Sequence, residues 1–220
     1  MKVLSQDIFA INKYARPRIE LIGNYKNILV IVDNFFENPE LVREHALSTT
    51  YFDEQTLCKL GTSDETTKWY THHLECNTDH FSDYFLKLKY SFFKDVRYHY
   101  DSMPHSYTYQ TYTDVTGVKP HTDASNYAGL VCLNYDEEIG ESVSGTGFYR
   151  VKETGQELIQ AGTYRSGRVG KLSPSQFERY HVERHKFNTL IFYEGSLLHT
   201  AIRTNWKSNT QRTTFNCFIW

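Results

Sequence analysis

The sequence of 220 residues lacks the features that mark several large classes of protein. It has four cysteines, and their positions show neither CxxC spacing nor a zinc-ribbon pattern. No apolar run approaches the ~20 residues that a membrane helix needs. The first residues have neither the apolar stretch nor the cleavage site of a signal peptide. We therefore expect a cytoplasmic protein with reduced cysteines and no membrane association.

The sequence also lacks an excess of charge of either sign. It carries 24 Lys and Arg against 26 Asp and Glu, so its global charge indicates neither nucleic acid nor an acidic membrane as a partner. It contains no internal repeat and no low-complexity segment. A chain of this length is typical of one domain and buries about 70% of its unfolded surface without disulfides. We predict a single domain over residues 1–220, and no feature specifies an oligomeric state.

Aromatic residues, in contrast, are abundant, with 17 Tyr and 14 Phe. Aromatic rings suit the half-buried surface of a β-sheet, and from residue 96 onward short β-like runs alternate with turn residues. Cys132 and Cys217 lie within such runs and are interpreted as small core residues. Many short strands predict a β-sandwich or barrel. The predicted strands are 96–100, 106–113, 118–122, 127–134, 147–151, 188–193, 198–203 and 213–220.

Residues 1–95 are predicted to form a supporting region. The run at 28–33 is mostly β-branched, which indicates a buried strand. A helix is predicted to begin at Pro39 with Asn38 as its N-cap, and a second helix to span 79–92. Each helix has apolar residues at helical spacing. These are Leu41, Val42, Ala46 and Leu47 in the first helix, and Phe81, Tyr84, Phe85, Leu88 and Phe92 in the second.

An excursion at about residues 152–186 interrupts the predicted strands. Between residues 150 and 186 there are eight Lys or Arg and four Glu. This excess of positive charge would attract an anionic substrate, or it reflects a solvated loop. Ser173, Pro174 and Gln176 match a capping box that begins a helix. The glycine-rich part before it is expected to act as a mobile lid, with Arg165 and Arg168 as candidate substrate contacts.

Three residues have the composition of a metal site. His121 and Asp123 are one residue apart in a predicted strand, so their side chains share one face. Pro120 before them favours extended backbone. His199 follows two leucines near the start of a later strand, where a solvated histidine is unexpected. Two imidazoles and one carboxylate bind one face of Fe(II) and leave its other positions open to small molecules.

The H-x-D/E spacing alone is weak evidence, because it occurs three more times. The other pairs are His73/Glu75, His99/Asp101 and His181/Glu183. The first lies in a polar connecting stretch, and the second ends a strand without a third ligand spaced like His199. The third is predicted to end the capped helix, where residues i and i+2 point apart. We therefore predict that His121, Asp123 and His199 are the metal ligands and catalytic residues.

Residues 106–220 resemble the Fe(II)/2-oxoglutarate-dependent dioxygenases, particularly their prolyl-hydroxylase-like branch. The run from Tyr112 to Asp123, YTDVTGVKPHTD, is similar to the tyrosine, glycine turn and H-x-D strand of that branch. The segments at 133–134 and 145–148 resemble its paired strands, and 211–214 resembles its closing strand. The resemblance implies a mainly β fold with flanking α-helices.

In the implied architecture, residues 96–220 form a double-stranded β-helix core, also called a jelly roll or cupin-like barrel, and residues 1–95 supply the N-terminal helices. The implied activity is that of an oxygenase which hydroxylates a small molecule or an amino-acid or peptide side chain. Its cofactor would be Fe(II) and its co-substrate 2-oxoglutarate, which is converted to succinate and CO2. Asp123 argues against an iron halogenase, in which a small residue replaces the carboxylate.

The resemblance also implies roles for residues around the metal. Arg212 is the candidate to bind the distal carboxylate of 2-oxoglutarate, because a guanidinium holds a carboxylate at two points. It lies further beyond His199 than is usual in the family, after a long polar turn. Thr214 would add a hydroxyl and Tyr112 a phenol. Asn134 is a candidate substrate or supporting residue, with a structural role in a turn as the alternative.

Two other classes fit parts of the pattern. A cupin-like metalloenzyme that does not use 2-oxoglutarate would share the barrel and the histidines but would not need Arg212. A non-catalytic jelly-roll binding module would use the histidines as ordinary polar residues. Conversion of 2-oxoglutarate to succinate distinguishes the first class from the predicted oxygenase, and absence of metal binding would support the second.

Overall fold

The computed structural model describes residues 6–49, 69–73, 79–94, 105–112, 119–139, 144–160, 172–202 and 211–220. The strands are β1 (Pro17–Ile22), β2 (Asn27–Val32), β3 (Trp69–His73), β4 (Ser106–Tyr112), β5 (Tyr127–Cys132), β6 (Gly145–Val151), β7 (Phe177–Arg184), β8 (Leu190–Glu194), β9 (His199–Ile202) and β10 (Arg212–Ile219). The helices are α1 (Pro39–Ser48), α3 (Asp79–Phe92) and α4 (Asp136–Ile139), with 3₁₀ turns η1 (Gln6–Phe9) and η3 (Pro174–Gln176). Within these ranges, no helix combines the length and the apolarity needed to cross a membrane.

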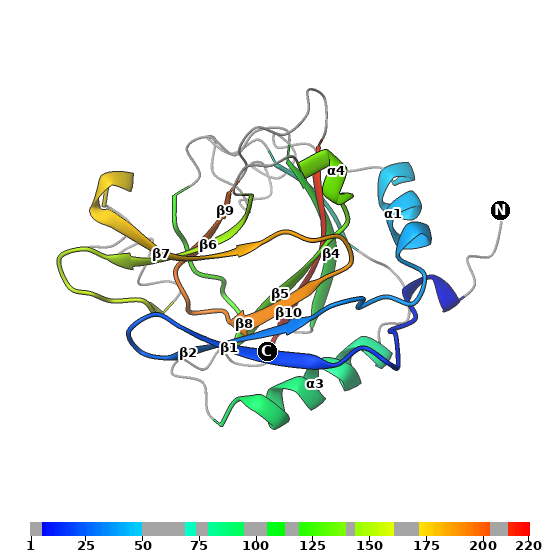
Figure 1. Cartoon of the computed structure of the whole chain (residues 1–220), viewed down its shortest axis with the longest axis horizontal. Coiled ribbons are helices and arrows are strands. Elements are labelled where there is room, and N and C mark those ends of the chain that lie inside the picture. Colours follow the sequence, from blue (N-terminus) through cyan, green and yellow to red (C-terminus); the bar gives the residue numbers. More distant parts are fainter. Residues whose placement is uncertain are drawn as a thin grey trace.

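The strands form two sheets, as Figure 1 shows. Seven strands lie in the order β1-β2-β8-β5-β10-β4-β3, and three lie in the order β7-β6-β9. Every pairing between these named strands is antiparallel. A mostly antiparallel protein with two sheets and few helices has the architecture of a β-sandwich or jelly roll. The β-rich fold predicted from the short strands is therefore confirmed at this level.

The main hydrophobic core lies between the larger sheet and the helices. Because side chains alternate along a strand, Phe215, Cys217 and Ile219 of β10 all point to this side. The Phe215 ring lies 5.3 Å from that of Phe36 and 5.2 Å from that of Phe81 in α3, between ring centroids. Burying an aromatic side chain of this kind contributes roughly 1.5–3 kcal/mol. This cluster anchors α3 to the sheet.

A second apolar cluster lies between the two sheets. Leu130 and Ile191 of the larger sheet pack there with Phe148 of β6. The Phe148 ring meets the Tyr193 ring edge to face, with centroids 5.2 Å apart. Phe218 of β10 packs against the same cluster. The even-numbered residues of β10, from 212 to 218, therefore face the space between the sheets.

Both predicted helices are present, and α3 has the predicted bounds. In α1, Val42 and Ala46 are buried as expected. Leu41 and Leu47, which were predicted on the same apolar face, are 46% and 55% exposed. The helix contacts the core along a narrower stripe than its sequence suggests. Cys132 and Cys217 are buried free thiols, which confirms their interpretation as core residues.

The helix predicted to follow Ser173 is wrong. The capping box is present, but it begins only the single turn η3, and the chain continues as β7. β7 pairs with β6 from Phe177 to Arg184, with one register shift between Phe148 and Tyr149. Tertiary pairing with an available strand here outweighs a local helix signal. His181 and Glu183 therefore lie on one face of a strand, contrary to the prediction.

The first part of the excursion is packed onto the body of the protein. Leu158 forms a β-bridge with Leu197, and the Ile159 N–H donates to the Ser196 carbonyl over 2.8 Å. Glu157 is fully buried and accepts a 2.8 Å hydrogen bond from Asn27 Nδ2. Residues 157–159 are thus packed onto the protein, although this part of the excursion was expected to be poorly ordered. The rest of the proposed lid, including Arg165 and Arg168, lies outside the described residues.

Other predictions fall outside the described residues or need revision. Residues 96–100 and 203 are not described, and 119–122 form one isolated bridge rather than a strand. The pairs His73/Glu75 and His99/Asp101 cannot be compared with the metal site, because their side chains are not among those described. β1 was not predicted from the sequence, because five of its six positions are only partly buried or exposed on an edge of the sheet.

Asn188 provides a test of how the N-terminal region is held. Its Oδ1 accepts from the Phe36 N–H (2.8 Å) and its Nδ2 donates to the Phe36 carbonyl (3.0 Å), at a φ of 56°. Asn188→Gly keeps this conformation and removes both bonds, so we expect the free energy of unfolding to fall by about 2–4 kcal/mol in urea denaturation. Lys26→Gly is the control, because Lys26 has a φ of 54° and an exposed side chain. Equal stability of the two variants would contradict the role of Asn188.

Candidate metal centre

The backbone holds two histidines side by side. His121 and His199 form an isolated antiparallel bridge, in which each N–H donates to the other carbonyl over 2.9 Å. His199 is the first residue of β9, and Pro120 favours extended backbone just before His121. The two imidazole rings are 4.6 Å apart between centroids. Main-chain pairing therefore brings together two residues that are distant in sequence.

Asp123 completes the group. Its N–H donates to the Gly195 carbonyl over 2.8 Å, and its Oδ2 lies 3.3 Å from His199 Nε2. One ligand atom from each of the three residues lies within 4.8 Å of the other two. A side chain at position 195 would overlap the Ser125 carbonyl, so only glycine allows the backbone at this position to lie so close to Ser125. The predicted triad of His121, Asp123 and His199 is thus assembled in space.

Backbone carbonyls determine which nitrogen of each imidazole is available. His121 Nδ1 lies 3.1 Å from the Lys119 carbonyl, and His199 Nδ1 lies 2.9 Å from the Leu197 carbonyl. A carbonyl only accepts, so Nδ1 carries a proton in both rings, and in a neutral ring Nε2 then keeps its lone pair. Burial lowers the pKa of His199 to about 4, against the raising effect of the Asp123 charge. His199 is therefore neutral at neutral pH, as a metal ligand must be.

This donor set fits a divalent transition metal. Two imidazoles and one carboxylate match the ligands of non-haem Fe(II), and both imidazoles have their second nitrogen fixed by a hydrogen bond. The His199 side chain is 8% exposed and that of Asp123 is 17% exposed. The group is therefore mostly buried but still accessible to solvent. Three protein ligands leave further coordination positions for small molecules.

Arg212 lies inside the protein together with a histidine that the sequence did not indicate. The arginine is 2% exposed, and its Nη2 donates to His185 Nε2 over 3.1 Å. Since guanidinium only donates, the imidazole accepts at Nε2 and carries its proton on Nδ1. Nδ1 has no hydrogen-bond partner in the described part of the chain. Burial and the charge of Arg212 hold the pKa of His185 well below its usual value.

The other residues predicted beside Arg212 have different surroundings. Thr214 is fully buried on the same face of β10, with Oγ1 3.5 Å from the Gln110 carbonyl. Tyr112 is the cross-strand partner of Arg212, but its side chain is outside the described residues. Asn134 accepts from the Thr213 N–H (2.7 Å) and donates to the Gln211 carbonyl (2.8 Å). These bonds hold the start of β10 in place, so they favour a structural role for Asn134 over contact with the substrate.

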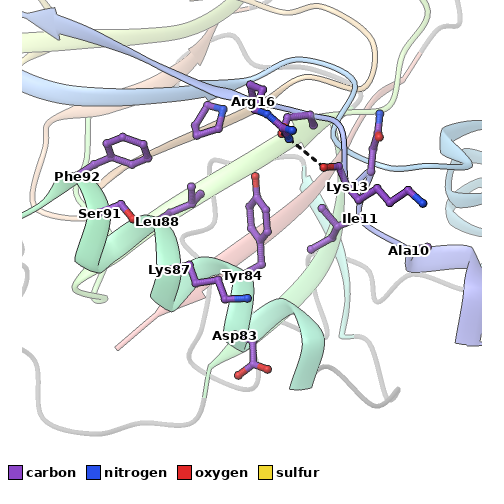
Figure 2. Close-up of a pocket in the computed structure, with 13 residues that line it drawn as sticks. Ala10, Ile11, Lys13, Arg16, Asp83, Tyr84, Lys87, Leu88, Ser91 and Phe92 are labelled. Carbon is purple, nitrogen blue, oxygen red and sulfur yellow. Dashed lines mark hydrogen bonds between the residues drawn. The ribbon is translucent and has the colours of Figure 1, made fainter.

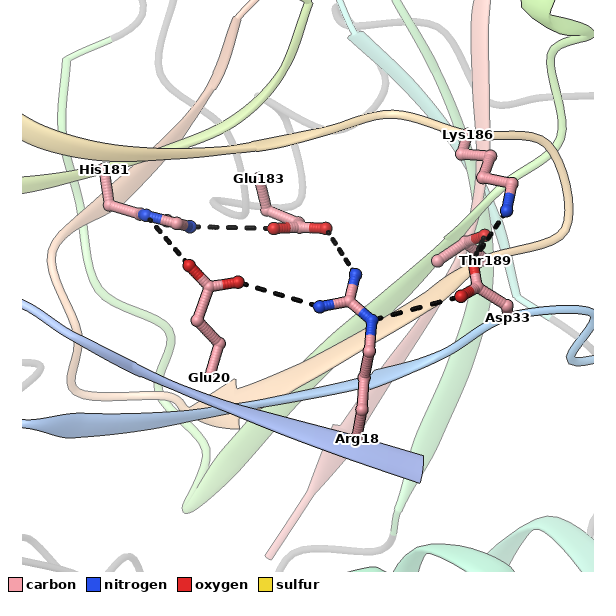
Figure 3. A network of polar contacts seen from close by, with 7 residues as sticks. All are labelled: Arg18, Glu20, Asp33, His181, Glu183, Lys186 and Thr189. Atoms are coloured by element: carbon pink, nitrogen blue, oxygen red, sulfur yellow. Dashed lines mark hydrogen bonds and ion pairs between the residues drawn. The ribbon is translucent and has the colours of Figure 1, made fainter. Parts of the chain in front are cut away.

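A second group of possible ligands, Glu20, His181 and Glu183, lies elsewhere (Figure 3). The two His181 nitrogens lie 3.7 Å from Glu20 and 3.6 Å from Glu183, so the carboxylates face opposite sides of the ring. Arg18 lies 3.7 Å from Glu20 and 3.6 Å from Glu183. Because the guanidinium already balances both carboxylates, we interpret this group as an ion-pair network.

A cavity of about 920 Å³ lies between residues 10–17 and α3, as Figure 2 shows. Lys13, Arg16 and Lys87 line it with positive charge. The Tyr84 hydroxyl is buried there and has no hydrogen-bond partner in the described ranges. None of the triad residues lines this cavity, which is beside α3 rather than between the sheets.

The chain belongs to a family of unknown function, DUF6445, whose model matches residues 13–219. No curated protein matches the sequence.

Similar solved structures include three proteins with low sequence identity. A prolyl-4-hydroxylase of Pseudomonas putida is 7% identical over 82% of this chain and 98% of its own, with a TM-score of 0.42. The non-heme alpha-ketoglutarate-dependent epimerase SnoN, from nogalamycin biosynthesis, is 10% identical over 88% and 78%, with a TM-score of 0.49. HygX of Streptomyces hygroscopicus, solved with nickel and 2-oxoglutarate, is 12% identical over 90% and 84%, with a TM-score of 0.42. All three scores are below 0.5, so the function of this chain has to follow from its own residues.

Metal binding is the first test of the triad. His121→Ala or Asp123→Ala should abolish binding of one equivalent of Fe(II) in anaerobic calorimetry, because each change removes one of three protein ligands. His181→Ala is the matched control and should bind as the wild type does, because it removes a histidine from the ion-pair network. Circular dichroism checks that each variant is folded. Equal loss of metal in all three folded variants would refute the assignment.

The environment of His185 predicts sensitivity to acid. Its folded pKa lies well below the ordinary 6.5, so the folded protein disfavours protonation that the unfolded chain accepts. The stability gained from neutral His185 is complete above pH 6.5 and is lost as the pH falls toward the folded pKa. His185→Gln should lose stability less steeply than the wild type toward about pH 5, by up to about 1.4 kcal/mol per pH unit. If urea denaturation shows that the free energy of unfolding falls equally with pH in the wild type and in His185→Gln, this prediction is contradicted.

Proposed function

We propose that this protein is an Fe(II)- and 2-oxoglutarate-dependent oxygenase with a double-stranded β-helix core. The observation that carries the proposal is the arrangement of His121, Asp123 and His199. His199 presents an unprotonated Nε2 toward the Asp123 carboxylate, and a ring nitrogen of His121 lies within 4.8 Å of both ligand atoms, inside a fold that also encloses a fixed arginine. A metal group and an enclosed cation together suit a metal-bound co-substrate that carries a second carboxylate.

The order of the strands supports the double-stranded β-helix. Without its outer strands, the larger sheet has the core order β8-β5-β10-β4. The bridge at His121 adds a fourth segment to the smaller sheet, beside β9. From β4 onward, β4, β5, β8 and β10 lie in the larger sheet, whereas the His121 segment, β6, β7 and β9 lie in the smaller sheet. The chain passes to the other sheet between successive segments, except between β6 and β7. Two sheets of four strands with the chain alternating between them are characteristic of a jelly roll.

Arg212 supports the choice of 2-oxoglutarate as co-substrate. A guanidinium stays charged in a poorly hydrated space and matches the two oxygens of a carboxylate. Thr214 is two residues further on the same face of β10, where its hydroxyl can add a hydrogen bond. His185 touches the guanidinium and stays neutral, so Arg212 keeps the positive charge of the pair. We assign Arg212 and Thr214 as the residues that bind the distal carboxylate of 2-oxoglutarate.

When Fe(II) is bound, it supplies the chemistry that couples oxidation of a substrate to conversion of 2-oxoglutarate into succinate and CO2. The residues of the chain hold and orient the participants. The single carboxylate of Asp123 leaves a net positive charge on a divalent metal, which favours anionic co-substrates. Tyr193 and Phe148 place rings 5.0 and 6.5 Å from the His199 ring, and these apolar walls exclude water from that side.

For the primary substrate we propose a small molecule or an amino-acid or peptide side chain that becomes hydroxylated. Arg165 and Arg168 are proposed contacts for an anionic group of that substrate, on residues outside the described ranges. Neither a nucleic acid nor a membrane is proposed as partner, since the charge of the chain is nearly balanced.

Arg212→Ala tests the co-substrate. We expect the affinity for 2-oxoglutarate to fall more than tenfold, because a partly buried, charge-assisted contact contributes about 2–5 kcal/mol. The affinity for Fe(II) should change little. Both are measured anaerobically, by calorimetry and by the visible charge-transfer band of the Fe(II)–2-oxoglutarate chelate. Arg43→Ala is the control, because Arg43 is also mostly buried and forms a 2.8 Å ion pair with Glu138.

The possible outcomes separate the three classes of function. A wild-type protein that binds Fe(II) but not 2-oxoglutarate supports the cupin-like metalloenzyme. A protein that binds no metal supports the binding module. If Arg212→Ala binds 2-oxoglutarate as the wild type does, another cation holds the distal carboxylate.

A further inference from the structure

Two neighbouring polar side chains between the sheets are buried without partners. Asn216 of β10 is 4% exposed and Thr108 of β4 is 2% exposed. They are direct cross-strand partners, so their side chains lie on the same face. In the described part of the chain, neither Asn216 Nδ2 nor Thr108 Oγ1 has a hydrogen-bond partner. Asn216 has an even number on β10, which places it on the face that Arg212 and Thr214 share.

Burying these two side chains costs free energy unless a ligand forms hydrogen bonds with them. A buried polar group without a partner destabilises a protein by about 1–3 kcal/mol. The same cross-strand row continues through Leu130 to Ile191, where apolar residues fill the space between the sheets. Two polar residues beside these apolar ones are therefore not required for packing. The amide nitrogen donates hydrogen bonds, so the missing partner is an acceptor such as a carboxylate or carbonyl oxygen.

The position of Asn216 indicates which acceptor. The neighbouring inner row of the sheet contains Phe218 and Tyr193, and the Tyr193 ring lies 5.0 Å from His199. That row is two residues from Asn216, or about 7 Å along the strand. Arg212 is four residues away in the opposite direction, or about 13 Å. Asn216 therefore lies nearer to the metal group than to Arg212.

We propose that Asn216 is a co-substrate-binding residue that donates from Nδ2 to the 2-oxo-acid end of 2-oxoglutarate. Thr108 adds its hydroxyl from β4. The inference rests on the proposed function, and it assigns this chain a second contact at the end of the co-substrate opposite to Arg212. Asparagine is suited to this position because it donates without adding a charge beside the metal.

Two 2-oxo acids distinguish the ends of the ligand. 2-Oxoglutarate has both ends, whereas 2-oxobutyrate has the 2-oxo-acid end and no distal carboxylate. Their affinities for the Fe(II)-loaded protein are measured anaerobically by calorimetry. For Asn216→Ala we expect both affinities to fall by a similar factor, on the order of tenfold, because a hydrogen bond to a charged group is lost. For Arg212→Ala we expect only the affinity for 2-oxoglutarate to fall.

Two further variants control for structural damage. Asn216→Asp keeps the shape of the side chain and replaces the donor by a carboxylate, so it should weaken both 2-oxo acids more than Asn216→Ala does. Cys217→Ala changes the adjacent buried residue on the opposite face of β10, and it should leave both affinities unchanged. The affinity of Asn216→Ala and of Cys217→Ala for Fe(II) alone, which should stay within about twofold of wild type, reports whether the site is intact.

The results separate this inference from the proposed function. If the wild type binds Fe(II) but neither 2-oxo acid, the proposed function fails and this inference fails with it. If the wild type binds both but Asn216→Ala binds them as the wild type does, only the inference on Asn216 is overturned. Loss of 2-oxoglutarate affinity alone in Asn216→Ala would also overturn it, because Asn216 would then contact the distal end.

Discussion

The reciprocal backbone hydrogen bonds between His121 and His199 are the constraint on which the metal centre depends. Residues that exchange both N–H···O bonds in an antiparallel pair have their side chains on the same side, with Cα atoms about 5.5 Å apart. A slip of one residue in this register would turn the side chain of either histidine to the opposite face. The position of the candidate ligands is therefore set by the pairing of the chain, and the proposed metal site forms only when β9 and the segment before β5 are correctly folded.

The structure separates the residues that stabilise the fold from those that form the site. On β10, Phe215 and Cys217 face the helices and belong to the aromatic core, whereas Arg212 and Asn216 face the space between the sheets. One strand thus serves both purposes through the alternation of its side chains. Because most aromatic packing is on the helix side, the inner face can carry buried polar groups that would otherwise cost stability.

The sequence could predict those features that depend on local patterns. The bounds of α3 follow from its helical spacing, and the triad follows from H-x-D spacing in an extended segment. β7 could not be predicted, because a genuine capping box at Ser173 starts only one turn and the partner strand β6 decides the rest. The misassigned helix also hid His185, whose contact with Arg212 depends on β7 ending beside it. Which buried polar groups lack partners, as at Asn216, depends on tertiary packing alone.

The unpaired groups also connect ligand binding to stability. His185 Nδ1, Asn216 Nδ2 and Thr108 Oγ1 are buried without hydrogen-bond partners among the described residues. Any ligand that provides acceptors to these donors removes part of the cost of burying them, and it does so only in the folded state. A ligand that binds the folded state alone stabilises it in proportion to the logarithm of its concentration. The proposed co-substrate would supply such acceptors, so its binding should raise the stability of the fold around β4, β7 and β10.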